Sequence, residues 1–455
     1  MRSNVLAAAG ALVAANAVHA SPTATEKQLP NRAASLPTVT ASGNAFWTGK
    51  DRFYVRGIDY QPGGSSDNAD PLADTDICTR DIKHFKDLGV NAVRVYSVDN
   101  SKDHTDCMNQ LSAAGIYLVL DVNNPLYSIN RDDPAPSYND VYLQSVFATI
   151  DEFAKYDNTL AFFSGNEVIN DIPDTVKSAP YVKATTRDMR QYIASRKYRA
   201  IPVGYSAADV SENRMQTAEY FNCGSDDERS DFFAFNDYSW CDPSSFTQSG
   251  WDQKVKNFTG YGLPIFLSEY GCIKNTRDFG ELSALMSDNM SSVYSGGLLY
   301  EYSREGDNYG IVQVSGSSET VTEETDYDNF KSALAKYPAP SGNGGFTSTT
   351  AAVSCPTADS VWDLGSWGQS ALPAIPAGAE KYMTAGAGDG PGLTGDGSQN
   401  AGGTSTGTAS PGSGSVSATS SGDSAGGRPA PPMDMSVFAV AGVVGFFTLA
   451  GTLLL

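Results

Sequence analysis

Apolar, strand-like runs alternate with amphipathic helical stretches through about 300 residues of this chain, from 40 to 338. The runs occupy 53–60, 91–98, 116–123, 159–168, 200–208, 232–240, 264–271 and 296–303. Helical patterns lie between or after them, among them 78–89, 141–156, 185–197 and 326–337. Near-continuous apolar strands that alternate with helices are typical of a parallel sheet covered by helices. Eight such units predict an α/β fold, a (β/α)8 or TIM barrel.

Polar side chains gather at the ends of the predicted strands. They are Asp59, Tyr60, Gln61, Arg94, Tyr96, Asp121, Asn123, Asn166, Glu167, Asn236, Asp237, Tyr238, Glu269, Tyr270, Tyr300, Glu301 and Tyr302. In a TIM barrel the C-terminal ends of the strands form the rim that carries the active site. A cap or a core hydrogen bond would explain any one of these residues. Seven such clusters on one rim are harder to explain in that way, and they indicate a functional site.

Two of the rim residues are glutamates on opposite strands. Glu167 ends the fourth predicted strand and Glu269 ends the seventh, and both strands are apolar. These strands lie across the barrel, so the two carboxylates are expected to face each other over the cleft. Glycoside hydrolysis uses such a pair: one carboxyl protonates the leaving oxygen and the other attacks the anomeric carbon. Retaining enzymes hold the two groups ~5 Å apart, and mutual repulsion then raises one pKa.

Neighbouring residues indicate which glutamate has which role. Asn166 precedes Glu167, and its amide can bind the 2-hydroxyl of a sugar, which predicts Glu167 as the acid/base. Glu269 could accept a hydrogen bond from the phenol of Tyr238, which would hold it ionised and predicts it as the nucleophile. The alternatives are structural. Glu167 would then be a strand-end cap, and Glu269 would form a buried ion pair with Arg94.

The N-terminus has the form of a signal peptide. Arg2 precedes an apolar, alanine-rich run that ends in a plausible cleavage site before Ser21, which predicts a signal peptide at 1–20. Residues 21–39 form a short N-terminal segment before the barrel.

The C-terminus ends in an uncharged apolar run, Val437–Leu455. One interpretation is a tail-anchored helix, because ~20 apolar residues span a bilayer. No positive residue follows the run, however, and small residues with a proline-rich spacer precede it. That order is typical of a GPI-attachment signal. We therefore expect the lipid on Ser424 and removal of residues 425–455.

Composition divides the chain between the barrel and this signal. Residues 339–383 form a C-terminal extension, and from 384 to 424 the chain is mostly Gly, Ser, Thr and Ala. Such a tract has few groups with which to build a core, which predicts a disordered Ser/Gly/Thr-rich stalk.

Charge and sequons restrict the partners and the location. The formal net charge of −21 argues against nucleic acid or anionic lipid as a partner. Asn257 and Asn289 lie in N-glycosylation sequons. Together with the two end signals, they place the protein outside a eukaryotic cell, at the membrane surface or wall. No run resembles a metal or phosphate site, so we expect neither a metal nor a cofactor.

The strand-end motifs resemble those of the fungal β-1,3-glucanosyltransferases, glycoside hydrolase family 72. The matching stretches are "YVRGIDYQPGG", "NAVRVYSVD", "LVLDVNNP", "FFSGNEVIND", "FNDYSWC", "PIFLSEYGC" and "GGLLYEYS...NYGIV", which cover essentially all of 40–338. "GNEV" alone would be a weak signal. Seven blocks in the same order, together with the anchor signals, are a specific one.

The resemblance implies an activity and a set of site residues. Glu167 matches the family's acid/base and Glu269 its nucleophile, in agreement with the roles derived above. The positions that would line the glucan cleft are Gln61, Tyr96, Asp121, Asn166, Tyr238, Tyr300 and Tyr309. The family cleaves a β-1,3-glucan chain internally, holds the segment as a glycosyl-enzyme and transfers it to the non-reducing end of another glucan. Donor and acceptor glucan chains, and a membrane reached through the GPI lipid, are the partners that this implies.

The chain departs from part of the family after the barrel. Some members carry a second, cysteine-rich glucan-binding module, but no cysteine follows Cys355 here. The resemblance therefore implies a form without that module, in which the barrel binds substrate alone.

Six cysteines allow 15 pairings. In the predicted barrel, Cys78 and Cys107 follow neighbouring strands, and so do Cys241 and Cys272. Each of these pairs can therefore lie on adjacent rim loops, which leaves Cys223 and Cys355. The resemblance supports the same connectivity, namely Cys78–Cys107, Cys241–Cys272 and Cys223–Cys355. Disulfides are expected in an exported chain. The last of these would tie the extension back to the barrel.

Two other functions are compatible with the residues. The first is an endo-β-1,3-glucanase, which would release the same segment to water. The second is a non-catalytic glucan-binding wall protein on an inactive barrel, although such a protein would not need both glutamates. Spacing alone does not distinguish transfer from hydrolysis.

Overall fold

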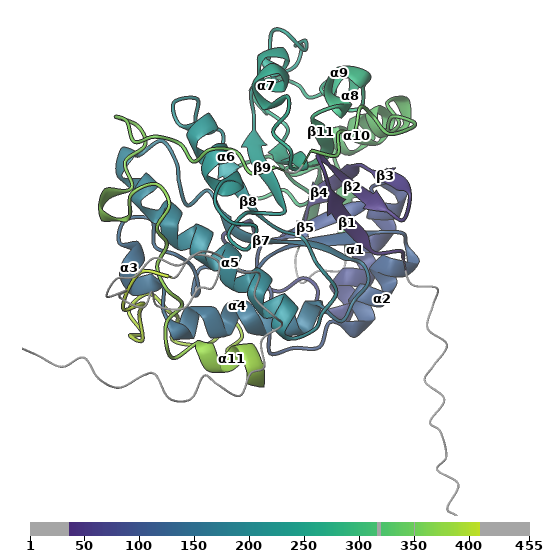
Figure 1. The fold of residues 1–455 in the computed structure, drawn as a ribbon. Helices are drawn as coiled ribbons and strands as arrows, with labels where there is room; N and C mark the ends of the chain where they lie inside the picture. Colours follow the sequence, from purple (N-terminus) through teal and green to yellow (C-terminus); the bar gives the residue numbers. More distant parts are fainter. Residues whose placement is uncertain (1–35, 316–319, 350, 410–455) are drawn as a thin grey trace, which may run out of the picture. The chain divides into compact units, whose positions relative to one another are not determined.

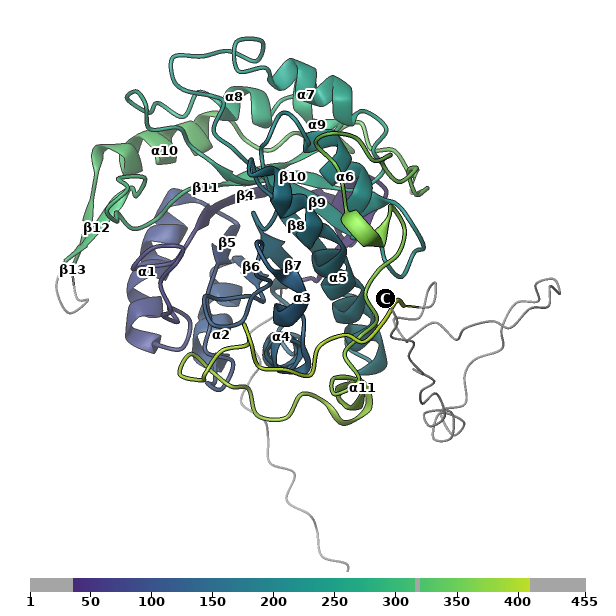
Figure 2. The ribbon, with the colours of Figure 1, turned by 90° about the vertical axis from the view of Figure 1, so that its left-hand side faces the viewer.

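The computed structural model describes residues 36–315, 320–349 and 351–409. Among these residues, eight parallel strands form a closed barrel in chain order (Figures 1 and 2). They are β4 (Val55–Asp59), β5 (Ala92–Val95), β6 (Tyr117–Asp121), β7 (Thr159–Asn166), β8 (Val203–Ala208), β9 (Phe232–Asp237), β10 (Ile265–Tyr270) and β11 (Tyr294–Leu299). The barrel closes where β11 pairs with β4. Each strand lies within or overlaps one of the eight predicted runs, so the TIM barrel prediction is confirmed.

Helices surround the barrel and connect its strands. They are α1 (Thr75–Leu88), α2 (Thr105–Ala113), α3 (Pro134–Ser137), α4 (Asp140–Phe153), η1 (Pro173–Ser178), α5 (Ala179–Ser195), α6 (Arg214–Asn222), α7 (Trp251–Phe258), α8 (Leu282–Leu285), α9 (Asp288–Ser291) and α10 (Thr325–Lys336). Local signals set their ends. Asp74 caps α1 by accepting hydrogen bonds from two backbone N–H groups, and Gly89 ends that helix in the left-handed conformation.

Two small antiparallel sheets were not foreseen from the sequence. The first consists of β1 (Val39–Ser42), β2 (Ala45–Thr48) and β3 (Asp51–Phe53). It places Phe46 against the rings of Phe232 and Phe266, with ring centroids 5.8 and 5.9 Å apart, and so closes one end of the barrel core. The second sheet is a hairpin of β12 (Val312–Ser315) and β13 (Thr320–Glu323).

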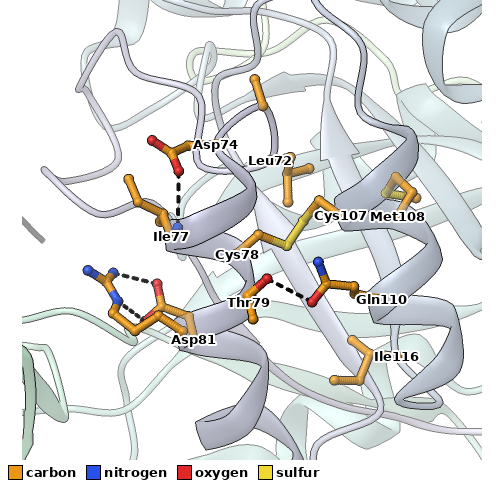
Figure 3. Close-up of a disulfide and its surroundings, with 12 residues drawn as sticks. Leu72, Asp74, Ile77, Cys78, Thr79, Asp81, Cys107, Met108, Gln110 and Ile116 are labelled. Carbon is orange, nitrogen blue, oxygen red and sulfur yellow. Dashed lines mark hydrogen bonds and ion pairs between the residues drawn. A yellow bond between two sulfur atoms is a disulfide. The ribbon is translucent and has the colours of Figure 1, made fainter. Parts of the chain in front are cut away.

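All six cysteines form disulfides in the expected pairs. Cys78–Cys107 joins α1 to α2, beside a hydrogen bond from Thr79 to Gln110 (Figure 3). Cys241–Cys272 joins the loops after β9 and β10. Cys223–Cys355 ties the C-terminal extension to the end of α6.

The C-terminal extension packs on the barrel farther along the chain than composition indicates. It contains η2 (Gly365–Trp367) and α11 (Glu380–Ala385), and residues 387–409 continue beside α4 and α5 (Figure 2). The first part of the predicted stalk, 384–409, therefore has a described structure held by hydrogen bonds. The rest of that stalk, the signal peptide and the attachment residue Ser424 lie outside the described residues.

Two further sequence expectations concern the surface. Asn257 on α7 and Asn289 on α9 are both exposed, as glycan acceptors must be, and their use remains a prediction. Within the described ranges, no helix combines the length and the apolar character that crossing a membrane requires.

Candidate active site

Glu269 lies at the end of β10 with only 7% of its surface exposed. Its Oε1 accepts hydrogen bonds from the Tyr96 hydroxyl at 2.8 Å and from Nη1 of Arg94 at 3.3 Å. Its Oε2 accepts from the Tyr238 hydroxyl at 2.7 Å, which is the contact expected from the sequence. Both carboxylate oxygens thus face donors, which favours the ionised form and fixes its orientation.

Arg94 on β5 is fully buried and holds two carboxylates. Its Nε and Nη2 donate to the two oxygens of Asp121 at 2.8 and 3.1 Å. The structural alternative for Glu269, an ion pair with Arg94, is therefore present, but Asp121 is the bidentate partner. Because Asp121 neutralises most of the guanidinium charge, Glu269 depends on the two phenols as well. Asp121 thus acts through Arg94 in addition to lining the cavity described below.

The pKa of the Glu269 carboxyl reflects opposing effects. The net pKa is raised to about 7: burial raises it most, the Arg94 charge lowers it, the Glu167 charge raises it, and the hydrogen bonds from Tyr238 and Tyr96 lower it. The two glutamates are therefore electrostatically coupled, so ionisation of one opposes ionisation of the other. Arg94, Tyr96 and Tyr238 oppose the rise in the Glu269 pKa and so favour its ionised form.

Two further acids beside Glu269 are buried without hydrogen-bond partners among the described residues. They are Asp59 at the end of β4 and Glu301 after β11. Burial raises the pKa of Asp59 well above its usual range and raises that of Glu301 to about 9. The raised pKa values favour the neutral form of both acids, which limits the negative charge around the nucleophile position.

Glu167 follows β7 at the point where the backbone turns. Its φ of 48° lies in the left-handed region, which costs a non-glycine residue about 1–2 kcal/mol. Its backbone N–H donates to the Ser206 carbonyl at 2.9 Å, which ties this turn to β8. The side chain is half-buried, and Oε1 accepts a hydrogen bond from Nδ2 of Asn236 at 2.8 Å. Oε2 makes no hydrogen bond within the described part of the chain, so it can meet a substrate oxygen.

A chain of side-chain hydrogen bonds connects the two glutamate strands. The Ser206 hydroxyl donates to Oδ1 of Asn166 at 2.7 Å, and Nδ2 of Asn236 donates to the same oxygen at 3.3 Å. Oδ1 of Asn236 in turn accepts from the Ser268 hydroxyl at 2.8 Å. This chain crosses β7, β8, β9 and β10 and fixes the amide of Asn236 toward Glu167. The Nδ2 group of Asn166 has no acceptor among the described residues. It is therefore available to a sugar hydroxyl, as the sequence argument expects.

Four tyrosines form an aromatic group at the rim. The Tyr300 ring meets those of Tyr96 and Tyr238 edge-on, each at 6.4 Å between centroids. Tyr309 lies 5.4 Å from the Tyr238 ring and 5.3 Å from the Tyr300 ring. The Tyr300 hydroxyl donates to Ser65 at 3.1 Å. The structure thus brings together all four tyrosines that the resemblance assigns to the cleft, with Tyr96 and Tyr238 bonded to Glu269.

A cavity of about 290 Å³ opens beside this group. Its lining comes from the ends of β6 and β7 and from the loops after β4, β5, β6 and β7: Ser65, Ser66, Tyr96, Ser97, Asp121, Asn123, Asn124, Pro125, Ser128, Ile129, Arg131, Ser164, Gly165, Asn166 and Val168. Hydroxyls and amides dominate this wall. Such groups suit a ligand rich in hydroxyls, with donors and acceptors on every edge.

Gln61 is placed differently from the other expected cleft residues. Its side chain is fully buried, and Oε1 accepts from the backbone N–H groups of Tyr96 and Ser97, each at 3.1 Å. Its Nε2 donates to the Ala69 carbonyl at 2.8 Å. Because the amide is used by the backbone on both sides, Gln61 holds the loop behind Tyr96. We therefore propose it as a positioning residue.

Sequence reasoning did not assign Asn236, Ser206 or Ser268 to the site. Asn236 stood among the strand-end clusters without a role. The two serines interrupt apolar strands, in "GYSAA" and "FLSEY", and small hydroxyls inside buried strands are a signal that could have identified them.

The phenol of Tyr238 gives a test of this geometry. Tyr238→Phe removes a hydrogen bond that lowers the pKa of Glu269, so that pKa should rise further. Since the ionised carboxylate is needed, the acidic limb of the kcat/KM–pH profile should move to higher pH by roughly one unit. Tyr300→Phe is the control, because that phenol donates to Ser65 and its loss should leave the limb in place. An acidic limb at the same pH in both variants would contradict the role of the Tyr238 hydrogen bond to Glu269.

Comparisons with known proteins place this chain among relatives. A profile of the glucanosyltransferases of glycoside hydrolase family 72 matches residues 28–338. The 1,3-beta-glucanosyltransferase gel1 of Aspergillus fumigatus is 64% identical over 388 residues, which is 85% of this chain and 84% of the relative. GAS5 of Saccharomyces cerevisiae, also named a 1,3-beta-glucanosyltransferase, is 54% identical over 78% of this chain and 73% of its own. The solved structure of Saccharomyces cerevisiae Gas2p in complex with laminaritriose and laminaritetraose matches with a TM-score of 0.67 at 39% identity, covering 72% of this chain and 75% of that chain.

Proposed function

The chain belongs to the glucanosyltransferases of glycoside hydrolase family 72, and from that premise we propose that Glu167 and Glu269 are its catalytic pair. Its activity is the transfer of β-1,3-glucan segments. The observation that supports the assignment is the contrast between the two carboxyls at the rim. Glu269 is buried with three donors on it, whereas Glu167 is half-buried with one amide donor and a free oxygen.

The first half-reaction cleaves the donor glucan. A carboxylate oxygen of Glu269 attacks the anomeric carbon while Glu167 gives its proton to the glycosidic oxygen. The bond between carbon and leaving oxygen breaks, and a glycosyl ester forms on Glu269. The charge on Glu269 disappears in this step, and Arg94, Tyr96 and Tyr238 hold the carboxylate in place before it reacts.

The second half-reaction transfers the segment. Glu167, now a carboxylate, takes the proton from the hydroxyl at the non-reducing end of an acceptor glucan. The acceptor oxygen attacks the anomeric carbon, the ester breaks, and Glu269 returns to its ionised form. Two inversions give a new β-1,3 bond with net retention. Throughout, we expect Nδ2 of Asn166 to bind the 2-hydroxyl of the reacting sugar, while its Oδ1 accepts from Ser206.

Transfer requires that sugar occupy the position from which water would otherwise attack. The tyrosine group supports this role because aromatic faces can pack against the C–H faces of pyranose rings. Among the described residues, Tyr300 and Tyr309 make no hydrogen bond to either glutamate, so their rings can serve an acceptor. A well-bound acceptor excludes water and places its hydroxyl on the glycosyl-enzyme.

Product size tests this function. The protein from Ser21 through Ala409 is incubated with a reduced β-1,3-gluco-oligosaccharide, and the products are separated by length. Products longer than the donor are expected. Shorter products alone would indicate the hydrolase, an endo-β-1,3-glucanase, and an unchanged donor would indicate a binding protein.

We also propose that the protein acts at the outer face of the plasma membrane and in the wall, anchored by a GPI lipid on Ser424. The pattern of the two chain ends supports this, and both ends lie outside the described residues. Release of the protein from intact cells by a phosphatidylinositol-specific phospholipase C would test it. Retention after that treatment would favour the tail-anchored alternative.

A further inference from the structure

Residues 387–404, here called the strap, run along the side of the barrel that carries α2 and α4 (Figure 2). The strap begins where the Ala387 N–H donates to the Tyr192 hydroxyl of α5 at 2.9 Å. It ends where Thr404 forms a bridge with Asn139 at the start of α4. The family profile ends at residue 338, well before this segment.

The strap bonds to three consecutive loops of the catalytic rim. In the loop after β4, Asn68 donates to the Leu393 carbonyl at 2.9 Å. In the loop after β5, the side chain of Asn100 accepts from the Gly392 N–H at 2.9 Å. These contacts are therefore made by the rim loops and not by the barrel strands.

The third loop, after β6, is held most closely. The Ser398 N–H donates to the Leu126 carbonyl at 2.9 Å, and Nε2 of Gln399 donates to the Ser128 carbonyl at 2.9 Å. Asn139 completes the set by donating to the Ser398 carbonyl at 2.5 Å. Ser128 itself lines the cavity that Tyr96 and Asn166 also line, so one residue carries both a strap contact and a cavity surface.

The same three loops supply most of the cavity wall. Ser65 and Ser66 come from the first, Ser97 from the second, and the third contributes six residues between Asn123 and Arg131. Glu167 and Glu269, in contrast, are fixed by the hydrogen-bond chain across β7 to β10 and by Arg94 and the two phenols. The strap therefore bonds to loops of the cavity wall, and within the described residues it makes no hydrogen bond to Glu167 or Glu269.

The glycines of the strap fit this close contact. A Cβ on Gly397 would lie 2.8 Å from the Leu126 carbonyl oxygen, and one on Gly395 would lie 2.1 Å from the Tyr127 hydroxyl. A Cβ on Gly403 would lie 2.1 Å from the Asp140 carboxylate. The glycine-rich composition alone indicates a flexible spacer. Here it allows the backbone of the strap to approach the loops this closely.

We propose that the strap is a positioning element of the glucan cleft, which sets the three loops at the spacing that binds the β-1,3-glucan chain. This inference rests on the proposed function. Its direct positioning residues are Gln399 and Gly397, which act on the loop after β6. Displacement of that loop weakens sugar binding while the two glutamates keep their geometry.

A pair of glycine variants separates this role from general stability. Gly397 and Gly402 both have left-handed φ angles, of 78° and 84°, so alanine at either position is strained by the backbone. Only at Gly397 does the new Cβ meet the rim loop, because nothing lies within 4 Å of a Cβ at Gly402. Gly397→Ala should raise KM for a long β-1,3-gluco-oligosaccharide by roughly three- to tenfold, with kcat within about twofold. Gly402→Ala should show a similar small fall in Tm and an unchanged KM.

A second pair tests the hydrogen bond itself. Gln399→Glu keeps the shape of the side chain and removes the donor to the Ser128 carbonyl, so KM should rise as for Gly397→Ala. Gln399→Lys retains a donor at similar reach and should restore most of the affinity. Such rescue would not follow from a purely structural loss.

The outcomes distinguish this inference from the proposed function. Elongated products from the unmodified protein and from Gly402→Ala establish transfer whatever the strap does. If Gly397→Ala and Gly402→Ala then share one KM, or if KM follows Tm across all four variants, the strap does not position the cleft. If the unmodified protein forms no elongated products, the proposed function is wrong, and the inference about the strap that rests on it is wrong as well.

Discussion

Replacement of Glu269 by alanine is expected to lower kcat/KM for a β-1,3-gluco-oligosaccharide by more than about a thousandfold. The variant loses the group that forms the glycosyl ester. It keeps Arg94, Tyr96 and Tyr238 facing the space that the carboxylate occupied. These donors favour a small anion there, so azide should restore turnover of an activated dinitrophenyl donor.

The configuration of the azide product identifies the role. Azide in place of the nucleophile attacks from the face opposite the leaving group, so the product should be an α-glycosyl azide formed with a single inversion. Nuclear magnetic resonance of the anomeric proton measures this. Glu219→Ala, at a partly exposed glutamate on α6, is the control and should behave as the unmodified protein. A β-glycosyl azide from Glu269→Ala would mean that Glu269 is the acid/base and Glu167 the nucleophile.

Replacement of Glu167 by alanine should lower turnover of natural glucan by roughly 10²–10⁴-fold, the usual contribution of a general acid. The reason is that the glycosidic oxygen leaves without a proton. A dinitrophenolate leaving group needs none, so the first half-reaction on that donor should persist. The glycosyl-enzyme then waits on Glu269 without a general base.

Azide again identifies the step. In Glu167→Ala it attacks the accumulated glycosyl-enzyme, so the product should be a β-glycosyl azide, with net retention. Mass spectrometry of the intact variant should also detect the trapped segment as an added hexose series. Full activity on natural glucan in this variant would remove Glu167 from the mechanism.

The barrel was predictable because burial on both faces makes each of its strands a continuous apolar run. Strand order then followed from the chain, since parallel neighbours in a (β/α)8 barrel are consecutive. The sheet of β1 to β3 escaped because its strands are only 4, 4 and 3 residues long. Its two-residue turns, each beginning with a glycine, Gly43 and Gly49, were the signal that could have revealed it.

The site was predictable where it depends on strand position alone. Tyr238 and Glu269 end neighbouring strands, β9 and β10, so their contact followed from the order of the strands. Gln61 shows the limit of that reasoning. It lies in a loop, and the conformation of the loop decides whether an amide faces the cleft or the backbone. Periodicity carries no information on that choice.

The close contacts of the strap restrict the insertions and deletions that its sequence can tolerate. Glycine-rich tracts commonly gain and lose residues without effect, because a spacer needs length rather than register. Between Gly392 and Gly403, however, particular glycines meet particular barrel groups, among them Leu126 and Asp140. A single inserted or deleted residue would bring a side chain to positions where only hydrogen fits. This stretch is therefore repetitive in composition, yet each glycine must keep its position relative to the group that it contacts.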